Sequence, residues 1–237
     1  MTKVVVEAGF KLVPGMHEEF TVVHDRILPL ASSQPGFISV YAGPILDSTW
    51  LYFGARFSDA KLMDDWHHHP RHQAVQRQAY ARWWSAVYLR KWVTPEPDAS
   101  PAQTFMCETR LVTSAQLGER EMVEVRSVLS QLGAAGAQRF ETLTGEYEPQ
   151  PYQFAGPLEI APHAEGSAYS LITHWASGDA VEAWLKSVPH QRLARLGALV
   201  SECFRALPES GERNHLRSDR KQREWTSSSP TQGSDGG

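Results

Sequence analysis

The feature that most constrains this chain is a Trp followed six residues later by a His, which occurs twice. The first copy is Trp66 with His72, and the second is Trp184 with His190. A pattern that returns in the same order and at the same spacing indicates that one structural unit is present twice. We therefore expect a tandem duplication, in which each copy contributes its own Trp and His.

Other landmarks keep the same order in both parts of the sequence. An aromatic residue precedes each Trp by nine positions, Phe57 in the first copy and Trp175 in the second. Further upstream, the Ala-Gly-Pro of 42–44 returns at 155–157. A chain of 237 residues is long enough for two domains of roughly 100 residues.

These repeats predict domain boundaries. We expect an N-terminal domain over residues 1–94, a Pro-rich polar linker over 95–103 and a C-terminal domain over 104–207. Residues 208–237 lose all hydrophobic periodicity and are rich in Ser, Gly, Arg and Asp, which predicts a disordered tail.

The first domain has the pattern β-α-β-β-α-β. Alternating or apolar runs predict strands, and apolar residues at helical spacing predict helices. Ser58 is the expected N-cap of the second helix, with Asp59 in its first turn and a break at Pro70. The predicted strands are Lys3–Leu12, Phe37–Ala42, Thr49–Phe57 and Trp84–Val93, and the first helix is Met16–Ser33.

The second domain repeats this order with a longer excursion around Gly145–Pro151. Its expected strands are Phe105–Val112, Ala137–Leu143 or Tyr152–Leu158, Ala168–Trp175 and Val200–Leu207. Its expected helices are Glu119–Leu132, Ala180–Leu185 and His190–Leu199.

A β-α-β-β-α-β unit is ferredoxin-like and leaves one face of its sheet without helices. A second sheet is the simplest cover for that face. The sequence therefore predicts an α+β protein in which two tandem ferredoxin-like domains pack sheet to sheet, as a monomeric pseudo-dimer or as a homodimer of such units.

Charge and composition exclude several classes of protein. The net charge is −4 and no basic run precedes the tail, so we expect no nucleic-acid partner. No apolar run reaches the ~18–20 residues that span a bilayer, and the N-terminus lacks the features of a secretory signal. Cys107 and Cys203 make neither a disulfide framework nor a metal-ligand spacing. We expect a soluble protein of the reducing cytoplasm with no membrane partner.

Eight Trp residues raise the question of a pocket for a flat ligand. Trp66 and Trp184 fit as aromatic walls with an indole N–H donor, although a Trp that packs beneath its own sheet explains each of them equally simply. Duplication does not separate these alternatives, because cores are duplicated too.

His72 and His190 follow Pro70 and Pro189, at or near the starts of helical segments. The helix dipole there lowers the pKa of a His, so that a neutral imidazole can act as a base near pH 7. A surface His at a helix end is the alternative. The adjacent His67–His69 do not predict a metal site, because successive helical side chains point about 100° apart.

Arg56 and His174 occupy equivalent positions in the third strand of each domain. Arg56 shares a strand face with Tyr52, which predicts either a pocket face or the interface between the sheets. A buried Arg needs an anionic partner, for which Glu7, Glu108 and a substrate phenolate are the candidates.

An ordered set of motifs gives a resemblance to a known family. The set comprises Val13–Phe20, Gln34–Phe37, Trp50–Tyr52, Phe57–Asp59 and Trp66–His72. It resembles the antibiotic-biosynthesis monooxygenase (ABM) superfamily of dimeric α+β barrels, closely over residues 3–94 and more loosely over 105–207.

The resemblance implies an oxygenase that tailors an aromatic polyketide in antibiotic biosynthesis. Single-domain members include anthrone oxygenases, which convert a phenolic ring to a quinone with no metal or tightly bound cofactor. Tandem members resemble enzymes that open the B ring of angucyclines by oxidative C–C cleavage of the Baeyer–Villiger type. These use O₂ and reduced flavin (FADH2 or FMNH2) as a diffusible reductant, which implies a flavin reductase as partner.

Taken with the residue chemistry, the resemblance gives a candidate site without metal. The expected catalytic residues are Trp66, His72 and Arg56, with the first domain as the favoured location. Leu62 stands where the family has an Asn hydrogen-bond donor. The expected substrate-binding residues are Leu62, Tyr52, Trp184, His190 and His174.

Three other functions fit the same pattern. A polyketide cyclase or aromatase would use the same pocket without consuming O₂. A haem-binding or haem-degrading barrel would need an axial His, for which His72 is the candidate, and would show a Soret band. A protein that only binds its ligand would lack turnover altogether.

Overall fold

A computed structural model describes residues 3–95, 104–137, 152–160 and 166–207 of the chain. The first half, residues 3–95, has the predicted order β-α-β-β-α-β, with the second helix broken into three short pieces. Its elements are β1 (Val4–Leu12), α1 (His17–Ser32), β2 (Phe37–Pro44), β3 (Trp50–Phe57), α2 (Ala60–His67), α3 (Pro70–Gln78), the π-helical turn η1 (Ala79–Trp83) and β4 (Trp84–Val93).

The second half, residues 104–207, follows the same order with one added short strand. Its elements are β5 (Phe105–Thr113), α4 (Glu119–Leu132), β6 (Tyr152–Ala155), β7 (Glu159–Ile160), β8 (Ser167–Trp175), α5 (Gly178–Leu185), α6 (Val188–Leu193) and β9 (Ala198–Ala206).

One predicted boundary in the second half is wrong. The helix expected over His190–Leu199 ends at Leu193, and strand β9 begins at Ala198. At Gly197 a Cβ atom would lie 2.3 Å from the backbone oxygen of Val112, so the chain passes too close to β5 there for a side chain. The linker from residue 96, most of the alternative strand Ala137–Leu143 and the predicted tail lie outside the described residues.

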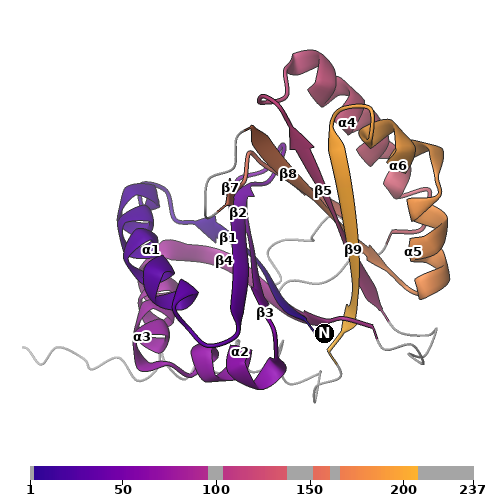
Figure 1. Ribbon diagram of the computed structural model, residues 1–237. Helices are drawn as coiled ribbons and strands as arrows, with labels where there is room; N and C mark the ends of the chain where they lie inside the picture. The colour runs from indigo at the N-terminus through magenta and orange to yellow at the C-terminus, as the bar shows by residue number, and fades with distance from the viewer. Residues whose placement is uncertain (1–2, 96–103, 138–151, 161–165, 208–237) are drawn as a thin grey trace, which may run out of the picture.

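All nine described strands form one antiparallel sheet in the order β6-β8-β5-β9-β4-β1-β3-β2-β7. The two halves meet where β4 pairs with β9, through Trp92 with Ala206 and Val93 with Arg205. At the far end, β2 pairs with β7, and Ile45 forms a bridge to Ala155 of β6. The sheet therefore curls round until its two ends touch (Figure 1).

The two halves place equivalent residues in the same register. In the first half Val5 of β1 lies opposite Arg56 of β3, and in the second Met106 of β5 lies opposite His174 of β8. The strand order β2-β3-β1-β4 likewise matches β6-β8-β5-β9. Residue positions in the two halves of the sheet therefore correspond one to one around Glu7 and Glu108.

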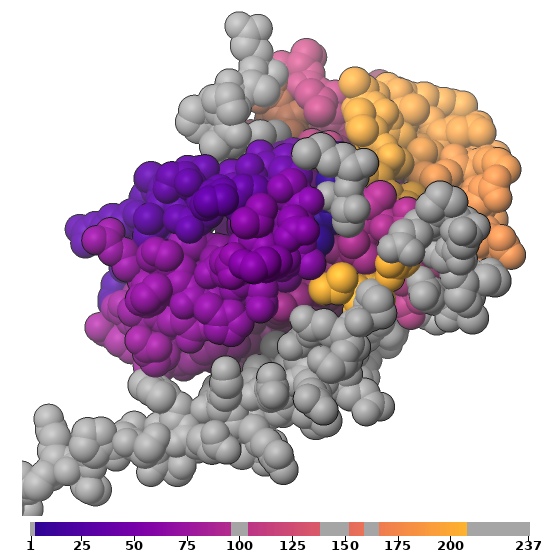
Figure 2. All heavy atoms as spheres, turned by 60° about the horizontal axis from the view of Figure 1, so that its bottom comes forward, coloured from indigo at the N-terminus to yellow at the C-terminus, as the bar shows by residue number. Residues whose placement is uncertain are grey.

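Helices cover only the outer faces of the curled sheet. In Figure 1, α1, α2 and α3 lie on one side of the molecule and α4, α5 and α6 lie on the opposite side, and Figure 2 shows the two halves lying against each other. Alternate strand residues point outward to the helices or inward to the other half. No helix in the described part of the chain has both the length and the apolar character needed to cross a bilayer.

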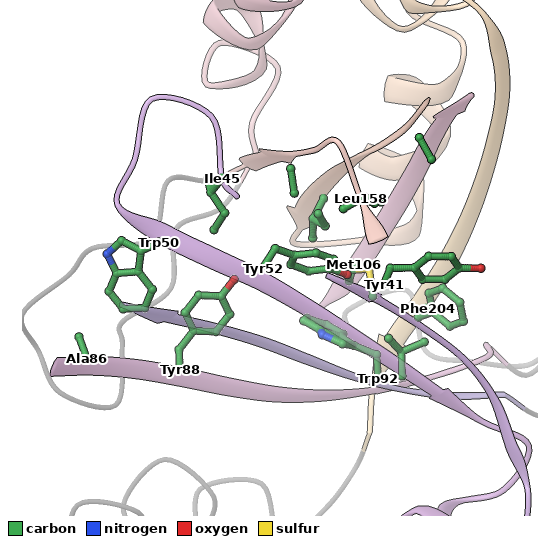
Figure 3. Packing of buried hydrophobic residues seen from close by; sticks show 14 residues of the cluster. Tyr41, Ile45, Trp50, Tyr52, Ala86, Tyr88, Trp92, Met106, Leu158 and Phe204 are labelled. Atoms are coloured by element: carbon green, nitrogen blue, oxygen red, sulfur yellow. The ribbon is translucent and has the colours of Figure 1, made fainter. Parts of the chain in front are cut away.

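Inward-pointing side chains of both halves meet in what we call the barrel interior (Figure 3). Its apolar part is mainly aromatic and draws on strands from each half. Prominent members are Tyr41, Trp50, Tyr52, Tyr88, Trp92, Met106, Ile172 and Phe204. The bare sheet faces predicted from the β-α-β-β-α-β pattern thus cover one another.

The start of α2 depends on Asp59, whose carboxylate accepts hydrogen bonds from the backbone N–H of Lys61 at 2.7 Å and of Leu62 at 3.2 Å. The prediction of Ser58 as N-cap was wrong by one residue.

We expect Asp59→Ala to lower the free energy of unfolding by about 0.5–2 kcal/mol, measured by urea denaturation. Asp25→Ala, within exposed α1, is the control and should cause no such loss; equal effects would contradict the capping role.

Candidate functional site

A cavity of about 170 Å³ lies in the first half, between the outer face of the sheet and the helices. Outward-pointing residues of β1, β3 and β4 form its floor, among them Val6, Phe53 and Leu89. Side chains of α1, α2, α3 and η1 form its walls. The aromatic residues of floor and walls together are Phe10, Phe20, Phe53, Phe57, Trp66, Tyr80, Trp83 and Trp84. Walls of this kind suit a flat apolar ligand.

A few polar side chains interrupt the apolar lining. They are His24, His67, His72, Gln76, Tyr80 and Lys91. The ammonium of Lys91 lies 3.6 Å from Asp64, and its side chain is largely buried. A cation and several imidazoles at the wall of an apolar cavity can orient a ligand that carries a hydroxyl group or develops negative charge.

Trp66 and His72 form a stacked pair at this wall, with ring centroids 4.5 Å apart and an interplanar angle of 13°. The Nδ1 atom of His72 lies 3.1 Å from the backbone carbonyl oxygen of Trp66. A carbonyl can only accept, so in the neutral ring the proton sits on Nδ1 and the lone pair on Nε2. Position and tautomer therefore leave Nε2 as the basic nitrogen.

The environment of His72 keeps its imidazole neutral. Burial lowers the pKa of His72 below its ordinary value, although hydrogen bonds to the backbone of Trp66 and His67 oppose this shift. The sequence predicted the same direction from the helix dipole, but burial is the larger cause. A neutral imidazole at the wall of a cavity can act as a general base.

His67 is a second imidazole at the cavity wall, and nothing in the sequence pointed to it beyond the run of three adjacent His residues. Burial, together with the neighbouring charges of His72 and Lys91, lowers its pKa to about 4. Its ring meets that of His72 edge-on at 5.9 Å. Across the described segments, no three His, Cys, Asp or Glu side chains converge as metal ligands would.

The depressed pKa of His67 predicts a pH effect on stability. Between pH 6.5 and about 4 the unfolded chain takes up a proton that the folded protein does not, so acid favours unfolding. We expect the free energy of unfolding to fall more steeply over this window in the wild type than in His67→Gln. Urea denaturation at a series of pH values measures both slopes. Parallel slopes would contradict the assigned shift.

The second Trp-His pair has a different environment. Trp184 is only 1% exposed and stacks on Trp175 at 6.0 Å, within a cluster that includes Val125 and Leu132. Its indole N–H has no hydrogen-bond partner among the described residues. His190 meets Trp184 edge-on at 5.3 Å, and its Nε2 lies 3.1 Å from Ser201 Oγ. Trp184 therefore belongs to the packed core of the second half.

Arg56, Tyr52 and His174 lie in the barrel interior, on the opposite face of the sheet from Trp66 and His72. The structure does not bring Arg56 to the Trp66–His72 pair, because residue 56 points inward while its neighbours Ala55 and Phe57 point to the cavity. Of the two predicted locations for this strand face, the structure places it between the two halves and away from the cavity.

Two buried polar pairs, one of them an ion pair, cross between the halves in this interface. Arg56 of the first half pairs with Glu108 of the second through its Nη2 atom. His174 of the second half pairs with Glu7 of the first, Nε2 to Oε2 at 3.0 Å. Glu7 also accepts a hydrogen bond from Trp92 Nε1 at 2.7 Å. The anionic partner expected for Arg56 is therefore Glu108.

These contacts set the ionisation of Glu7. Burial raises its pKa, but the charges of His174 and Arg90 and the hydrogen bonds from His174 and Trp92 outweigh burial and lower it to about 2. For His174, burial is the larger cause and lowers its pKa. The pair is thus best described as a carboxylate that accepts a hydrogen bond from a neutral imidazole.

Leu62 does not reach the cavity. It packs over the turn between α1 and β2, where a Cβ on Gly36 would lie 2.5 Å from Leu62 Cδ1. Gly36 has a positive φ of 77°, so a side chain there would also strain the backbone. The Leu62 side chain therefore packs against the turn at Gly36 and stabilises the fold there.

The fold has relatives among solved structures. An aldoxime dehydratase matches with a TM-score of 0.52 at 9% identity, over 86% of this chain and 81% of that one. An anthrone oxidase-like protein matches with a TM-score of 0.33 at 11% identity, over 87% and 91%. A protein of Fusobacterium nucleatum, provisionally named a monooxygenase, matches with a TM-score of 0.37 at 6% identity, over 86% and 91%. No family model and no curated protein matches the sequence.

These likenesses concern the fold alone, because identities are so low. The match with the aldoxime dehydratase indicates a similar overall fold and nothing about what this chain does.

Proposed function

We propose that the chain is an oxygenase of the antibiotic-biosynthesis monooxygenase type, and that it binds a polycyclic phenol in the first-half cavity. The main support for this proposal is the stacked Trp66–His72 pair, which places a neutral imidazole at the wall of an apolar, aromatic-lined cavity. An aromatic polyketide of the anthrone or angucycline class combines the flat shape and the acidic hydroxyl that such walls and such a base would accept.

The proposed role of His72 is to take a proton from the phenol through Nε2. Its Nδ1–H is held by the carbonyl of Trp66, so the acceptor nitrogen keeps one orientation. Lys91, on the same cavity wall, supplies a positive charge that favours the resulting phenolate. An electron-rich phenolate can pass an electron to O₂, which closed-shell phenols do only slowly.

The apolar walls support this chemistry in two ways. They hold the ring system flat and in one orientation, which replaces a random encounter by a fixed geometry. They also exclude water, so the charge of Lys91 acts through a low dielectric. Reduced flavin, supplied by a reductase, enters the proposal as a diffusible reductant for ring opening, whereas conversion of an anthrone to a quinone requires only O₂.

The domain organisation belongs to the same proposal. The matched strand orders and registers support two tandem ABM-like domains, 1–94 and 104–207, of which the first carries the chemistry. In the second, Trp184 fills the core and so supports the fold. In this proposal one chain is a pseudo-dimer of its two domains, and it acts in solution either as a monomer or as a homodimer.

Oxygen uptake tests the proposal. The purified protein is mixed with a tricyclic anthrone, with and without reduced FMN, while O₂ is followed by electrode and products by mass spectrometry. We expect O₂ consumption with formation of an oxygenated product. No O₂ uptake and no conversion of the anthrone, although it binds, would overturn the oxygenase and leave a protein that only binds the ring system.

Trp66 should contribute to ligand binding through its face. We expect Trp66→Ala to weaken anaerobic binding of the anthrone about tenfold, because stacking and apolar burial worth about 1.5 kcal/mol are lost. Isothermal titration calorimetry measures the affinity. Trp184→Phe is the matched control in the second half, and its affinity should equal that of the wild type. A larger loss for Trp184→Phe would move the ligand to the second half.

A further inference from the structure

The two cysteines of the chain lie side by side in the second half. Cys107 of β5 is directly opposite Cys203 of β9 in the antiparallel register, and their sulfur atoms are 3.4 Å apart. Both are free thiols. We propose that this pair is a site of reversible oxidation, at which hydrogen peroxide converts the two thiols to a disulfide between β5 and β9.

The backbone already has the spacing that such a bond needs. Directly opposed residues of antiparallel strands have Cα atoms about 4.5–5.5 Å apart, and disulfides join Cα atoms about 4.4–6.8 Å apart. The sulfur atoms must approach by little more than an ångström, which side-chain rotation can provide. Because the strands are held by the pairing of Met106 with Phe204 and of Glu108 with Glu202 on either side, oxidation requires no change of register.

The two thiols differ in a way that sets the order of events. Cys203 is partly exposed, whereas Cys107 is buried. The hydrogen bond between them lowers the pKa of Cys203 and raises that of Cys107, and burial raises the pKa of Cys107 further. Cys203 is therefore the thiolate that meets the oxidant, and Cys107 is the resolving thiol.

The reaction balances with hydrogen peroxide as the oxidant. The Cys203 thiolate attacks one peroxide oxygen, the O–O bond breaks, and the sulfur becomes a sulfenic acid while hydroxide leaves. Cys107 sulfur then attacks Cys203 sulfur, the S–S bond forms, the S–O bond breaks, and a second hydroxide leaves. Protons from the two thiols convert both hydroxides to water, so the sulfurs lose two electrons and the peroxide gains them.

A line of hydroxyl groups leads away from the buried thiol. Cys107 Sγ is 3.9 Å from Thr109 Oγ1, which is 2.9 Å from Ser201 Oγ, and Ser201 lies 3.1 Å from His190 Nε2. These contacts connect the Cys107 thiol to the half-buried imidazole of His190, which lies in the second half and away from the first-half cavity.

Mass spectrometry of the full chain tests the proposal. The reduced protein is treated with hydrogen peroxide, quenched, denatured and alkylated, and then digested without reductant. We expect the intact protein to lose two hydrogen atoms, neither cysteine to be alkylated, and a cross-linked peptide to join Cys107 to Cys203. Dithiothreitol should restore both alkylation sites. Alkylation of both cysteines after peroxide treatment, or a cross-link between two chains, would overturn the proposal.

Single variants test the order of events. Cys107→Ser should leave a sulfenic acid on Cys203 that dimedone traps, because no resolving thiol remains. Cys203→Ser should leave Cys107 unmodified under the same conditions. Dimedone labelling of Cys107 in the second variant would contradict the assignment of Cys203 as the attacking thiol. If either variant fails to fold, the peptide map of the wild type still decides whether the disulfide forms.

Discussion

Replacement of Glu108 by Gln is expected to lower the free energy of unfolding by about 3–5 kcal/mol. The change removes the negative charge opposite Arg56 but keeps the shape of the side chain and leaves Ser170 in place as a hydrogen-bond donor. Arg56 is then a buried cation whose closest carboxylate in the other half is Glu202, at 3.9 Å from Nε. Urea denaturation followed by circular dichroism measures the loss.

A surface carboxylate provides the matched control. Glu182 pairs with Lys186 on exposed α5 at 2.5 Å, and Glu182→Gln should leave stability unchanged. The double variant Arg56→Met/Glu108→Gln removes both charges and should be more stable than Glu108→Gln alone, because no unpaired charge remains buried. Equal stability of Glu108→Gln and Glu182→Gln would show that the interior pair contributes little.

Replacement of His72 by Gln is expected to reduce kcat for anthrone oxidation by about 10²–10⁴-fold, because the base for the phenol proton is lost. The proposal also predicts how kcat depends on pH. The pKa of His72 is lowered by burial, so wild-type activity should persist to a pH below the ordinary His value of about 6.5 and fall when the ring is protonated. The variant should lack this acid limb.

His68→Gln is the control for this experiment. His68 is an exposed neighbour that does not line the cavity, so its replacement should leave kcat and the pH profile unchanged. Unfolding curves of both variants should match the wild type closely enough to exclude a folding defect. A His72→Gln enzyme with full kcat and an intact acid limb would remove His72 from the chemistry.

The sequence was sufficient to predict the order of elements in the described regions. Pro14 and Gly15, Pro35 and Gly36, and the alternation along each strand marked the boundaries of the first half within a residue or two. The predicted sheet-to-sheet packing is matched by the aromatic cluster between the halves. Turn residues and strand alternation are local features, so they can be recognised in the sequence alone.

The candidate site was predicted only in part, because its composition depends on which face of each strand meets the helices. Trp66 and His72 do line the first-half cavity, while Arg56, Tyr52 and His174 were grouped with them although they point to the opposite face. A one-residue offset in a strand reverses the direction of a side chain, and position alone did not say which face formed the pocket.

Several lining residues were missed although the sequence contained a signal for them. Lys91 follows Val87 and Leu89 at alternate positions of β4, which places it on their face of the sheet. His24 follows Phe20 by one helical turn and so shares its apolar face. Nothing in the sequence indicated that Cys107 and Cys203 lie opposite each other, because that depends on the register between β5 and β9.

The two polar pairs of the interior, Arg56 with Glu108 and His174 with Glu7, are related by an exchange of the halves. Glu7 and Glu108 hold equivalent positions, as do Arg56 and His174, so each half carries one acid and one base and offers both to its counterpart. This is the rule of an isologous contact, in which residue i meets residue j and j meets i. Each half is thus self-complementary in charge. A symmetric pair of first halves would set Arg56 against Glu7 twice, and this chain has the same arrangement with a His in place of one Arg.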